Sequence, residues 1–300
     1  MYGDVFTPKG VIGGPPCQSF SQANVNQQDD DPRHSIPVVY ADLIAKLNAR
    51  APIDFFVMEN VVGITQSKHR KTLIRIIRRF ERAGFEVASN ILDAKYYGTP
   101  QARERFFLVG FNKQKFGSLK WTSPLPQSGP LLTVRQTIEG LPPATLFERG
   151  LDSNLFPHHP NHWCMKPKSP KFLRPGALKA GDVKSRSFKT LAWDRPSIAV
   201  AYGHREVHIH PSGTRRLTVY EAMRLQGFPH EYRLRGTLSS QITQVSEAVP
   251  PPLALAVAKS VQAQIYSGTE GRSADEVVNL HGAQRKSGEP SLPRAKVIVS

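Results

Sequence analysis

The sequence has 300 residues, enough to bury a sizeable core and to form one large domain or two smaller ones. Its 40 Lys and Arg residues against 24 Asp and Glu give a formal charge of +16, which favours a partner that carries phosphates over a merely basic protein. No apolar run approaches the ~18 residues of a membrane span, and we expect no signal peptide. Two cysteines, Cys17 and Cys164, make no disulfide framework, so we expect a cytoplasmic protein.

The first predicted element is a short strand at residues 10–12, which leads into the tight loop Gly13-Gly-Pro-Pro-Cys-Gln-Ser-Phe-Ser21. Two glycines let other groups approach the backbone closely, and two prolines fix φ and keep the loop out of a helix. The side chain of Cys17 is therefore held in place, as a nucleophile must be. A buried structural cysteine in a turn is the alternative interpretation.

Helical and strand patterns follow one another from residue 35 to residue 111. The predicted helices are 35–50, with Val38, Val39, Leu43, Ile44 and Leu47 on one face, and 71–83, with Leu73, Ile74, Ile77 and Phe80 on one stripe. The predicted strands are 54–58, 86–92 and 105–111, and a turn is expected at 97–100. The fold class indicated is α/β.

Three residues in this region are candidates for function because of their positions relative to the predicted strands. Glu59 follows the strand 54–58, at the end where open α/β sheets place their ligands, although an acid there is more often a solvated surface group. Arg103 and Arg105 have alternate-residue spacing, so on extended backbone both would point to one face.

The composition changes after Lys120, where proline, glycine, serine and lysine become frequent. Residues 166–189 carry eight Lys or Arg against one Asp, which suits contact with phosphates, or else a disordered linker. Histidines and a cysteine in this half of the chain have weak spacings for zinc, and we predict no metal; they are His158, His159, His162, Cys164, His208 and His210.

The last third contains two predicted helices. Thr218-Val-Tyr-Glu221 is a capping box, and Gly227 and Pro229 are stop signals, so a helix is expected over 219–226 with Val219, Ala222 and Met223 buried. Three prolines at 250–252 lead into an apolar core helix over 253–265. Residues 267–300 are polar without a sustained period and are predicted to be a disordered tail.

Five blocks, taken in order, resemble the motifs of the DNA (cytosine-5) methyltransferases. They are Gly13-Gly-Pro-Pro-Cys-Gln-Ser-Phe-Ser21, Glu59-Asn-Val61, Gln101-Ala-Arg-Glu-Arg105, Arg216-Leu-Thr-Val-Tyr-Glu-Ala-Met-Arg-Leu-Gln-Gly-Phe-Pro229 and Gln244-Val-Ser-Glu-Ala-Val-Pro-Pro251. The resemblance spans residues 4 to about 265, apart from the variable middle. It implies a Rossmann-like, S-adenosylmethionine-dependent methyltransferase fold that is N-terminally incomplete, with a small, irregular target recognition domain inserted. The domains expected are a catalytic part at 1–120, target recognition at 121–212, a return to the catalytic domain at 213–266 and the tail.

The resemblance also implies roles for individual residues. Cys17 would add as a thiolate to C6 of a cytosine flipped out of double-stranded DNA, so that C5 can take a methyl group from S-adenosylmethionine. Glu59 would hydrogen-bond N3 and the exocyclic amine, and Arg103 would hold O2. Of Arg103 and Arg105, one would meet the base and the other brace the site. The cofactor contacts implied are Asp4, Pro16, Glu247 and Ala248.

Two departures from the family pattern bear on activity. The glycine-rich turn and the acid that follow the family's first two strands are missing, since only nine residues precede the first strand; a separate chain supplying them is one expectation. Ser246-Glu247 stands where the family usually has Gly-Asn. The functions considered are therefore a DNA methyltransferase of a bacterial restriction-modification or orphan type, a truncated or split-enzyme subunit acting only as a DNA-binding module, and an RNA methyltransferase of the same chemistry.

Overall fold

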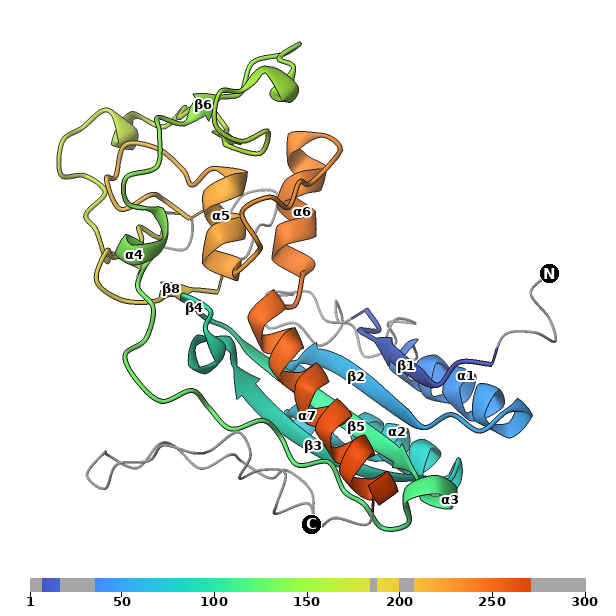
Figure 1. The fold of residues 1–300 in the computed structure, drawn as a ribbon. Coiled ribbons are helices and arrows are strands. Elements are labelled where there is room, and N and C mark those ends of the chain that lie inside the picture. Colours follow the sequence, from blue (N-terminus) through green and yellow to red (C-terminus); the bar gives the residue numbers. More distant parts are fainter. Residues whose placement is uncertain (1–6, 17–35, 184–187, 200–207, 271–300) are drawn as a thin grey trace. The chain divides into compact units, whose positions relative to one another are not determined.

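The computed structural model describes residues 7–16, 36–183, 188–199 and 208–270. These residues divide between two compact units (Figure 1). The first unit takes its residues from 1–92, 104–125 and 257–300, and the second from 93–103 and 126–256. Residues 213–256, which we expected to rejoin the catalytic domain, pack within the second unit; where the functional domains divide stays a prediction.

The first unit is built on a mixed sheet of four strands. They are β1 (Gly10–Gly13), β2 (Phe55–Val61), β3 (Phe85–Asp93) and β5 (Glu104–Asn112), in the order β1-β2-β5-β3. β1 runs parallel to β2 with Gly10 opposite Phe55, and β2 runs antiparallel to β5 with Glu59 opposite Phe107. All four strands were predicted from the sequence, with ends that differ by at most three residues.

Helices cover both faces of this sheet. Figure 1 shows α1 (Ile36–Arg50) and α2 (Arg70–Arg82) behind the sheet and the later part of α7 (Pro251–Glu270) in front of it. α7 is tied to the segment after β5, because Trp121 Nε1 donates to Ser260 Oγ (3.0 Å) and Gln264 bonds both backbone groups of Thr122 (2.8 Å each). The helix continues to Glu270, so the prediction of a tail from residue 267 is wrong for 267–270; later residues lie outside those described.

The core between the sheet and α1 and α2 corrects both predicted stripes. On α2 the buried residues are Leu73, Ile76, Ile77 and Phe80, whereas Ile74 is 37% exposed. On α1 they include Val38, Ala41 and Ile44, whereas Val39 and Leu43 are 59% and 52% exposed. Residues three or four apart share one face of a helix, and the exposed residues are rotated away from that face.

The second unit contains short elements joined by irregular chain, in keeping with the predicted irregular segment. Its helices are α4 (Val134–Ile138), α5 (Val219–Gln226) and α6 (Leu238–Glu247), and its strands are the two-residue pairs β4 (Gln101–Ala102) with β8 (Ser197–Ile198) and β6 (Thr145–Leu146) with β7 (Trp163–Cys164). Short helical turns complete both units: η2 (Val62–Thr65), η3 (Ser67–His69), η4 (Ala94–Tyr97), α3 (Lys113–Phe116), η5 (Ser153–Leu155) and η6 (Pro170–Phe172).

α5 confirms the capping-box prediction in full. Thr218 Oγ1 accepts from the backbone N–H of Glu221 (2.9 Å), and the Glu221 carboxylate accepts from the N–H of Thr218 (2.8 Å). Gly227 ends the helix at φ 84°, a left-handed conformation that favours glycine. Val219, Ala222 and Met223 are buried as expected, so α5 forms the centre of the second unit's hydrophobic core.

Within the described residues, no helix is both long and apolar enough to cross a membrane.

Candidate active-site residues

The loop after β1 is described as far as Pro16, so Cys17 and Asp4 lie outside the described residues. Both glycines of the loop make close approaches. A Cβ on Gly13 would lie 2.7 Å from the ring of Tyr40, and a Cβ on Gly14 would lie 3.0 Å from Oε2 of Glu59. The carboxylate of Glu59 therefore lies against the backbone three residues before Cys17.

Asn60 ties the same loop to β2. Its side chain is 1% exposed, and Nδ2 donates to the carbonyl of Pro15 at 3.2 Å. Pro15 is buried and Pro16 is exposed. A buried amide on a central strand thus fixes the position of the chain directly before the cysteine.

Glu59 lies inside β2 rather than after it, because the strand continues to Val61. In the antiparallel register Glu59 faces Phe107 and Val61 faces Arg105, so Glu59 and Arg105 are diagonal neighbours on one face of the sheet. Arg105 Nε lies 2.9 Å from Glu59 Oε1, and the two side chains are 15% and 18% exposed. The guanidinium therefore orients a carboxylate that stays accessible to a ligand.

Arg103 occupies a different environment. It lies in the break between β4 and β5, so the argument from alternation along one continuous strand does not apply. The residue is 3% exposed; its backbone N–H donates to Asp93 Oδ1 (2.9 Å), and its guanidinium donates to the carbonyl of Ser246 (2.5 Å). Arg103, Asp93 and Ser246 all belong to the second unit.

The two late motifs meet at the end of α6. Gln226 Nε2 donates to the carbonyls of Ala248 (2.6 Å) and Val245 (3.2 Å). Ala248 caps the helix, and Glu247 is exposed in its last turn with no ion pair to any described residue. A carboxylate is unfavourable at a helix C-terminus because the carbonyl end of the dipole is negative. Glu247 therefore does not stabilise α6.

Our sequence analysis missed three residues that organise these regions. Tyr40 packs on Gly13, and its hydroxyl donates to the carbonyl of Val57 at 3.2 Å. Asn60 was noted as part of a motif, but not as the residue that holds the loop. Arg215 forms two 2.7 Å hydrogen bonds to the fully buried carboxylate of Glu221. The sequence offered one indication of this arginine: Glu221 belongs to a predicted capping box, and an acid that is buried there needs a cationic partner.

Four histidines of the second unit pack around Tyr220. The ring centroids of His158, His159, His162 and His230 lie 4.3–5.7 Å from that of Tyr220. Among the residues that the structure describes, no three His, Cys, Asp or Glu side chains are placed to hold a metal ion. Burial, then the neighbouring charges of His162 and His230, lowers the pKa of His158, and burial lowers the pKa values of His159 and His210 to about 4.

These histidines predict that the second unit loses stability in mild acid. Because the folded pKa values lie below the ordinary value near 6.5, the unfolded chain binds more protons between pH 6.5 and 4. Stability is therefore complete above about pH 6.5 and falls toward pH 4, by at most ~1.4 kcal/mol per pH unit for each histidine. Thermal unfolding at pH 7.5, 6 and 5 measures this. We expect His159→Gln to flatten the dependence; a constant Tm over this range would contradict the prediction.

The fold and the residues around β1 and β2 define an α/β protein with a carboxylate beside a cysteine-bearing loop. The C-5 cytosine-specific DNA methylase family model matches residues 4–263, so the chain belongs to this family. The chain is 32% identical to the type II methyltransferase M.NmeDI of Neisseria meningitidis serogroup C, over 89% of this chain and 66% of the relative. It is also 32% identical to M.MthTI of Methanothermobacter thermautotrophicus, over 84% and 78%. The chain thus spans about two thirds to four fifths of these relatives.

Solved structures share the fold. A prophage-encoded E. coli protein classed as a DNA modification methyltransferase superposes with a TM-score of 0.66 at 21% identity, over 88% of this chain and 81% of that one. The Entamoeba histolytica methyltransferase EhMeth gives a TM-score of 0.55 at 14% identity, over 87% and 78%. At these identities the likeness concerns the fold alone, and it confirms the α/β prediction.

Proposed function

We propose that this protein methylates C5 of cytosine in double-stranded DNA, as a methyltransferase of the type II restriction-modification kind. The observation that carries the proposal is the position of the Glu59 carboxylate, which Arg105 orients and which lies against Gly14, three residues before Cys17. Family membership and the type II relatives support the same reaction.

The chemistry required explains this arrangement. C5 of cytosine is a weak nucleophile until another group adds to C6. The Cys17 thiolate forms the Sγ–C6 bond, and the electron pair displaced from the ring makes C5 nucleophilic. Glu59 accepts a hydrogen bond from the exocyclic amine and passes a proton to N3 as the thiolate adds, which neutralises the negative charge that develops on the ring. After methylation, loss of the C5 proton to a base re-forms the double bond and expels the thiolate.

The contacts favour Arg105 over Arg103 as the arginine that meets the base. Arg105 holds the carboxylate that would bind N3, and O2 of cytosine is the carbonyl oxygen on C2, the ring carbon next to N3. Arg103 is buried, and its guanidinium bonds the Ser246 carbonyl at the end of α6. We therefore assign O2 to Arg105 rather than to Arg103, to which the family resemblance gave it, and we assign the bracing role to Arg103.

S-adenosylmethionine would supply the methyl group as an electrophilic sulfonium. The residues expected to contact it fit such a ligand where the structure describes them: Pro16 exposes an apolar ring, and Glu247 presents a carboxylate that can accept from hydroxyl or amino groups. Its position in the last turn of α6, where the helix disfavours it, agrees with a role in binding a ligand. Ala248, held by Gln226, fixes the turn that follows.

The positive charge of the chain supports binding to DNA, because contacts with phosphates offset the cost of exposing the target base. Cytosine C6 is inside the base stack, so the target must flip out at a cost of a few kcal/mol, offset by pocket and backbone contacts. In the second unit, the exposed Lys168 and Lys171 belong to the basic stretch 166–189 and suit phosphate contacts, which position the protein without reading sequence.

Trapping by a suicide substrate tests the proposal. The complete gene product, with S-adenosylmethionine and duplex DNA in which every cytosine is 5-fluorocytosine, should form a complex that survives denaturation, because fluorine prevents the final elimination. Substituting all cytosines avoids the need to know the target sequence.

Variants of the two cysteines sharpen the test. Cys17→Ser should abolish trapping, whereas Cys164→Ser should trap like the wild type, because the Cys164 thiol is 3% exposed and burial raises its pKa to about 11. Equal trapping by Cys17→Ser would refute the nucleophile. DNA binding without trapping by the wild type would favour a non-catalytic DNA-binding module.

A further inference from the structure

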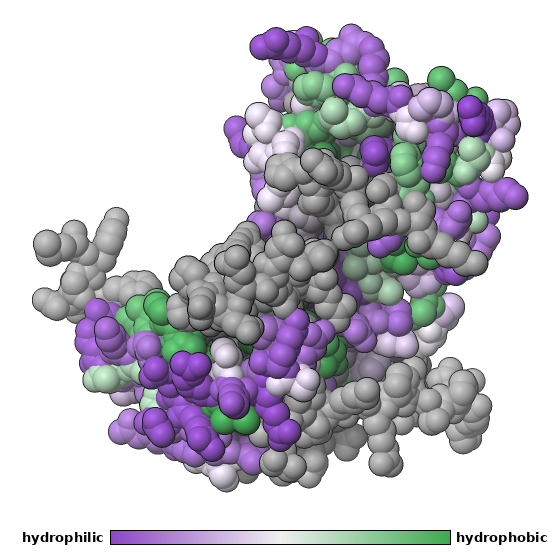
Figure 2. Space-filling model, turned by 180° about the vertical axis from the view of Figure 1, so that it is seen from behind, coloured by the Kyte–Doolittle hydropathy of each residue, from purple (hydrophilic) through white to green (hydrophobic). Residues whose placement is uncertain are grey.

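The outer face of α2 is strongly basic. Over 13 residues the helix carries six cations and one acid, Glu81. The cations are Arg70, Lys71, Arg75, Arg78, Arg79 and Arg82. All except the half-buried Arg79 are exposed, while the apolar stripe of the helix is buried in the core of the first unit. Figure 2, which views the molecule from behind, shows hydrophilic residues gathered over the face that carries α1 and α2.

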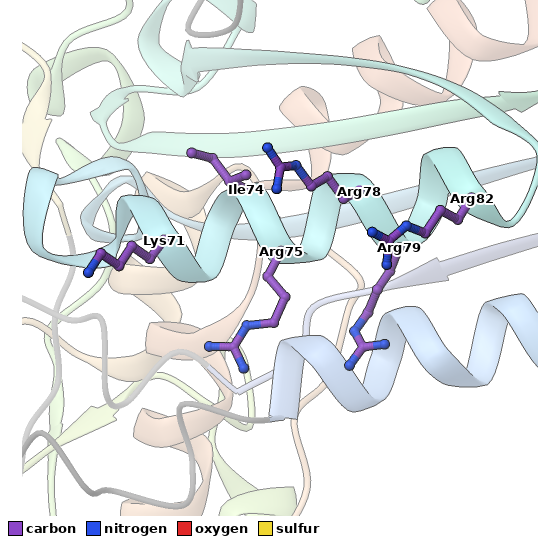
Figure 3. A pocket seen from close by; sticks show the side chains of 6 residues that line it. All are labelled: Lys71, Ile74, Arg75, Arg78, Arg79 and Arg82. Atoms are coloured by element: carbon purple, nitrogen blue, oxygen red, sulfur yellow. The ribbon is translucent and has the colours of Figure 1, made fainter.

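Almost none of this charge is neutralised. Arg79 pairs with Asp42 of α1, with Nη1 of the arginine 3.0 Å from Oδ1 of the aspartate. Among the described residues, no carboxylate forms an ion pair with Lys71, Arg75, Arg78 or Arg82. In Figure 3 the side chain of Arg79 reaches toward the neighbouring helix, and the other cationic side chains extend from α2 over its length.

The arrangement works against the helix that carries it. Like charges three or four residues apart repel one another, and α2 contains five such pairs: 71–75, 75–78, 75–79, 78–82 and 79–82. Arg70 and Lys71 stand in the first turn, where the helix dipole disfavours positive charge. A solvated face that served only solubility would intersperse acids, which would stabilise the helix. The charge therefore has a use outside the helix.

The outer surface of α2 is also slightly hollowed. Lys71, Ile74, Arg75, Arg78, Arg79 and Arg82 line a hollow of about 290 Å³ (Figure 3). From residue 71 to residue 82 the α-helix rises ~16 Å, so the cations form a row rather than a point. Duplex DNA presents a phosphate about every 1.7 Å of its axis, and several phosphates can face a row of this length at once.

We propose that this row, defined as Lys71, Arg75, Arg78 and Arg82, binds the phosphate backbone of duplex DNA without regard to sequence. Three of its four members are arginines, whose planar guanidinium matches phosphate oxygens two at a time. A membrane surface is disfavoured, because a helix that lies on lipid exposes its apolar face, and α2 buries its own against the sheet. The choice of DNA as the polyanion rests on the proposed function.

Salt-dependent binding to a duplex without cytosine tests the inference separately from methyl transfer. The probe is alternating poly(dA-dT), which cannot be methylated at C5 of cytosine. For Arg75→Gln/Arg78→Gln/Arg82→Gln, the slope of log K against log salt should be shallower than in the wild type by about 2.7, at ~0.9 per lost phosphate contact. When the salt is raised from 50 to 200 mM, the affinity of both proteins for the duplex falls. The fall for the variant should be ~40-fold smaller than the fall for the wild type.

A matched variant removes the same charge from scattered positions of the same unit. Lys9, Lys46 and Lys259 are exposed and form no ion pair with a described residue, so Lys9→Gln/Lys46→Gln/Lys259→Gln should keep the wild-type slope. The Tm of the arginine variant should not fall, since like-charge repulsion is relieved.

Two results would overturn the inference: equal slopes for all three proteins, or equal flattening by both triple variants. Vesicles that contain phosphatidylserine distinguish the other source of phosphate. Binding to them that is lost in the arginine variant, with duplex binding unchanged, would assign the row to lipid instead. The trapping experiment separately decides whether the chain is a methyltransferase.

Discussion

Replacing Glu59 with glutamine should slow covalent trapping by 5-fluorocytosine DNA by ~10²–10⁴-fold, the usual contribution of a positioned acid–base group. The glutamine side chain keeps the size of Glu59, but it can neither carry a negative charge nor relay a proton to N3 as Cys17 adds. Because the ion pair with Arg105 is largely buried, the Tm of the variant must also be measured, so that slow trapping by a folded protein is separated from unfolding.

Glu86→Gln is the control for this variant. Glu86 lies on β3 in the same sheet; its side chain is also 18% exposed, and it has two cationic partners, Lys113 at 3.1 Å and Lys120 at 3.4 Å. The Glu86→Gln variant should be trapped by 5-fluorocytosine DNA at the wild-type rate. Arg105→Gln should be slow as well, and adding it to Glu59→Gln should cost less than the two separate losses combined, because the pair acts as a unit. A fast Glu59→Gln, or an equally slow Glu86→Gln, would remove Glu59 from the mechanism.

The elements of the first unit could be predicted because its sequence is locally consistent. Short apolar strands such as Phe55–Val61 and the amphipathic pattern of α2 each allow one structure. Within α2, however, the assignment of Ile74 to the buried stripe failed. The closely spaced isoleucines at 74, 76 and 77 satisfy a helical period in more than one way, and only packing against the sheet decides which of them are buried.

The candidate site was predicted as a set of residues but not as a geometry. Glu59 and the cysteine loop were found because motifs mark them. That Gly14 makes room for the Glu59 carboxylate depends on the parallel pairing of β1 with β2, which spans some forty residues of sequence. The different environments of Arg103 and Arg105 also depend on long-range contacts, with Ser246 in one case and Glu59 in the other. Alternation along a strand contains no information about either.

Replacing Arg215 with methionine should destabilise the second unit by about 3–5 kcal/mol, as removal of one partner of a buried ion pair does. Glu221 is fully buried, and Arg215 donates two 2.7 Å hydrogen bonds to it. Burial is the largest influence and would raise the pKa of Glu221, but the hydrogen bonds and charge of Arg215, with smaller contributions from His210 and the N–H of Thr218, together outweigh it and lower the pKa. Without Arg215 the carboxylate would remain buried, with the backbone N–H of Thr218 as a neutral donor. Urea or thermal unfolding measures the loss.

Three comparisons separate this effect from a general loss of packing. Arg135→Met removes a guanidinium that also bonds a carboxylate through two nitrogens, on Asp194, but that pair is exposed, so its loss should lower the stability far less than the loss of Arg215. Arg215→Met/Glu221→Gln should recover most of the stability, since glutamine keeps the capping box and leaves no buried charge.

The third comparison is the dependence of the unfolding free energy on pH. In Arg215→Met the pKa of Glu221 should rise above its ordinary value of 4.5, so the folded variant takes up a proton as the pH falls through that raised pKa, and the relief of the buried charge is complete at about pH 4.5. The difference in unfolding free energy between wild type and variant should therefore be largest near neutrality and shrink in acid. A difference that stays constant with pH would mean that Arg215 acts through its packing rather than its charge.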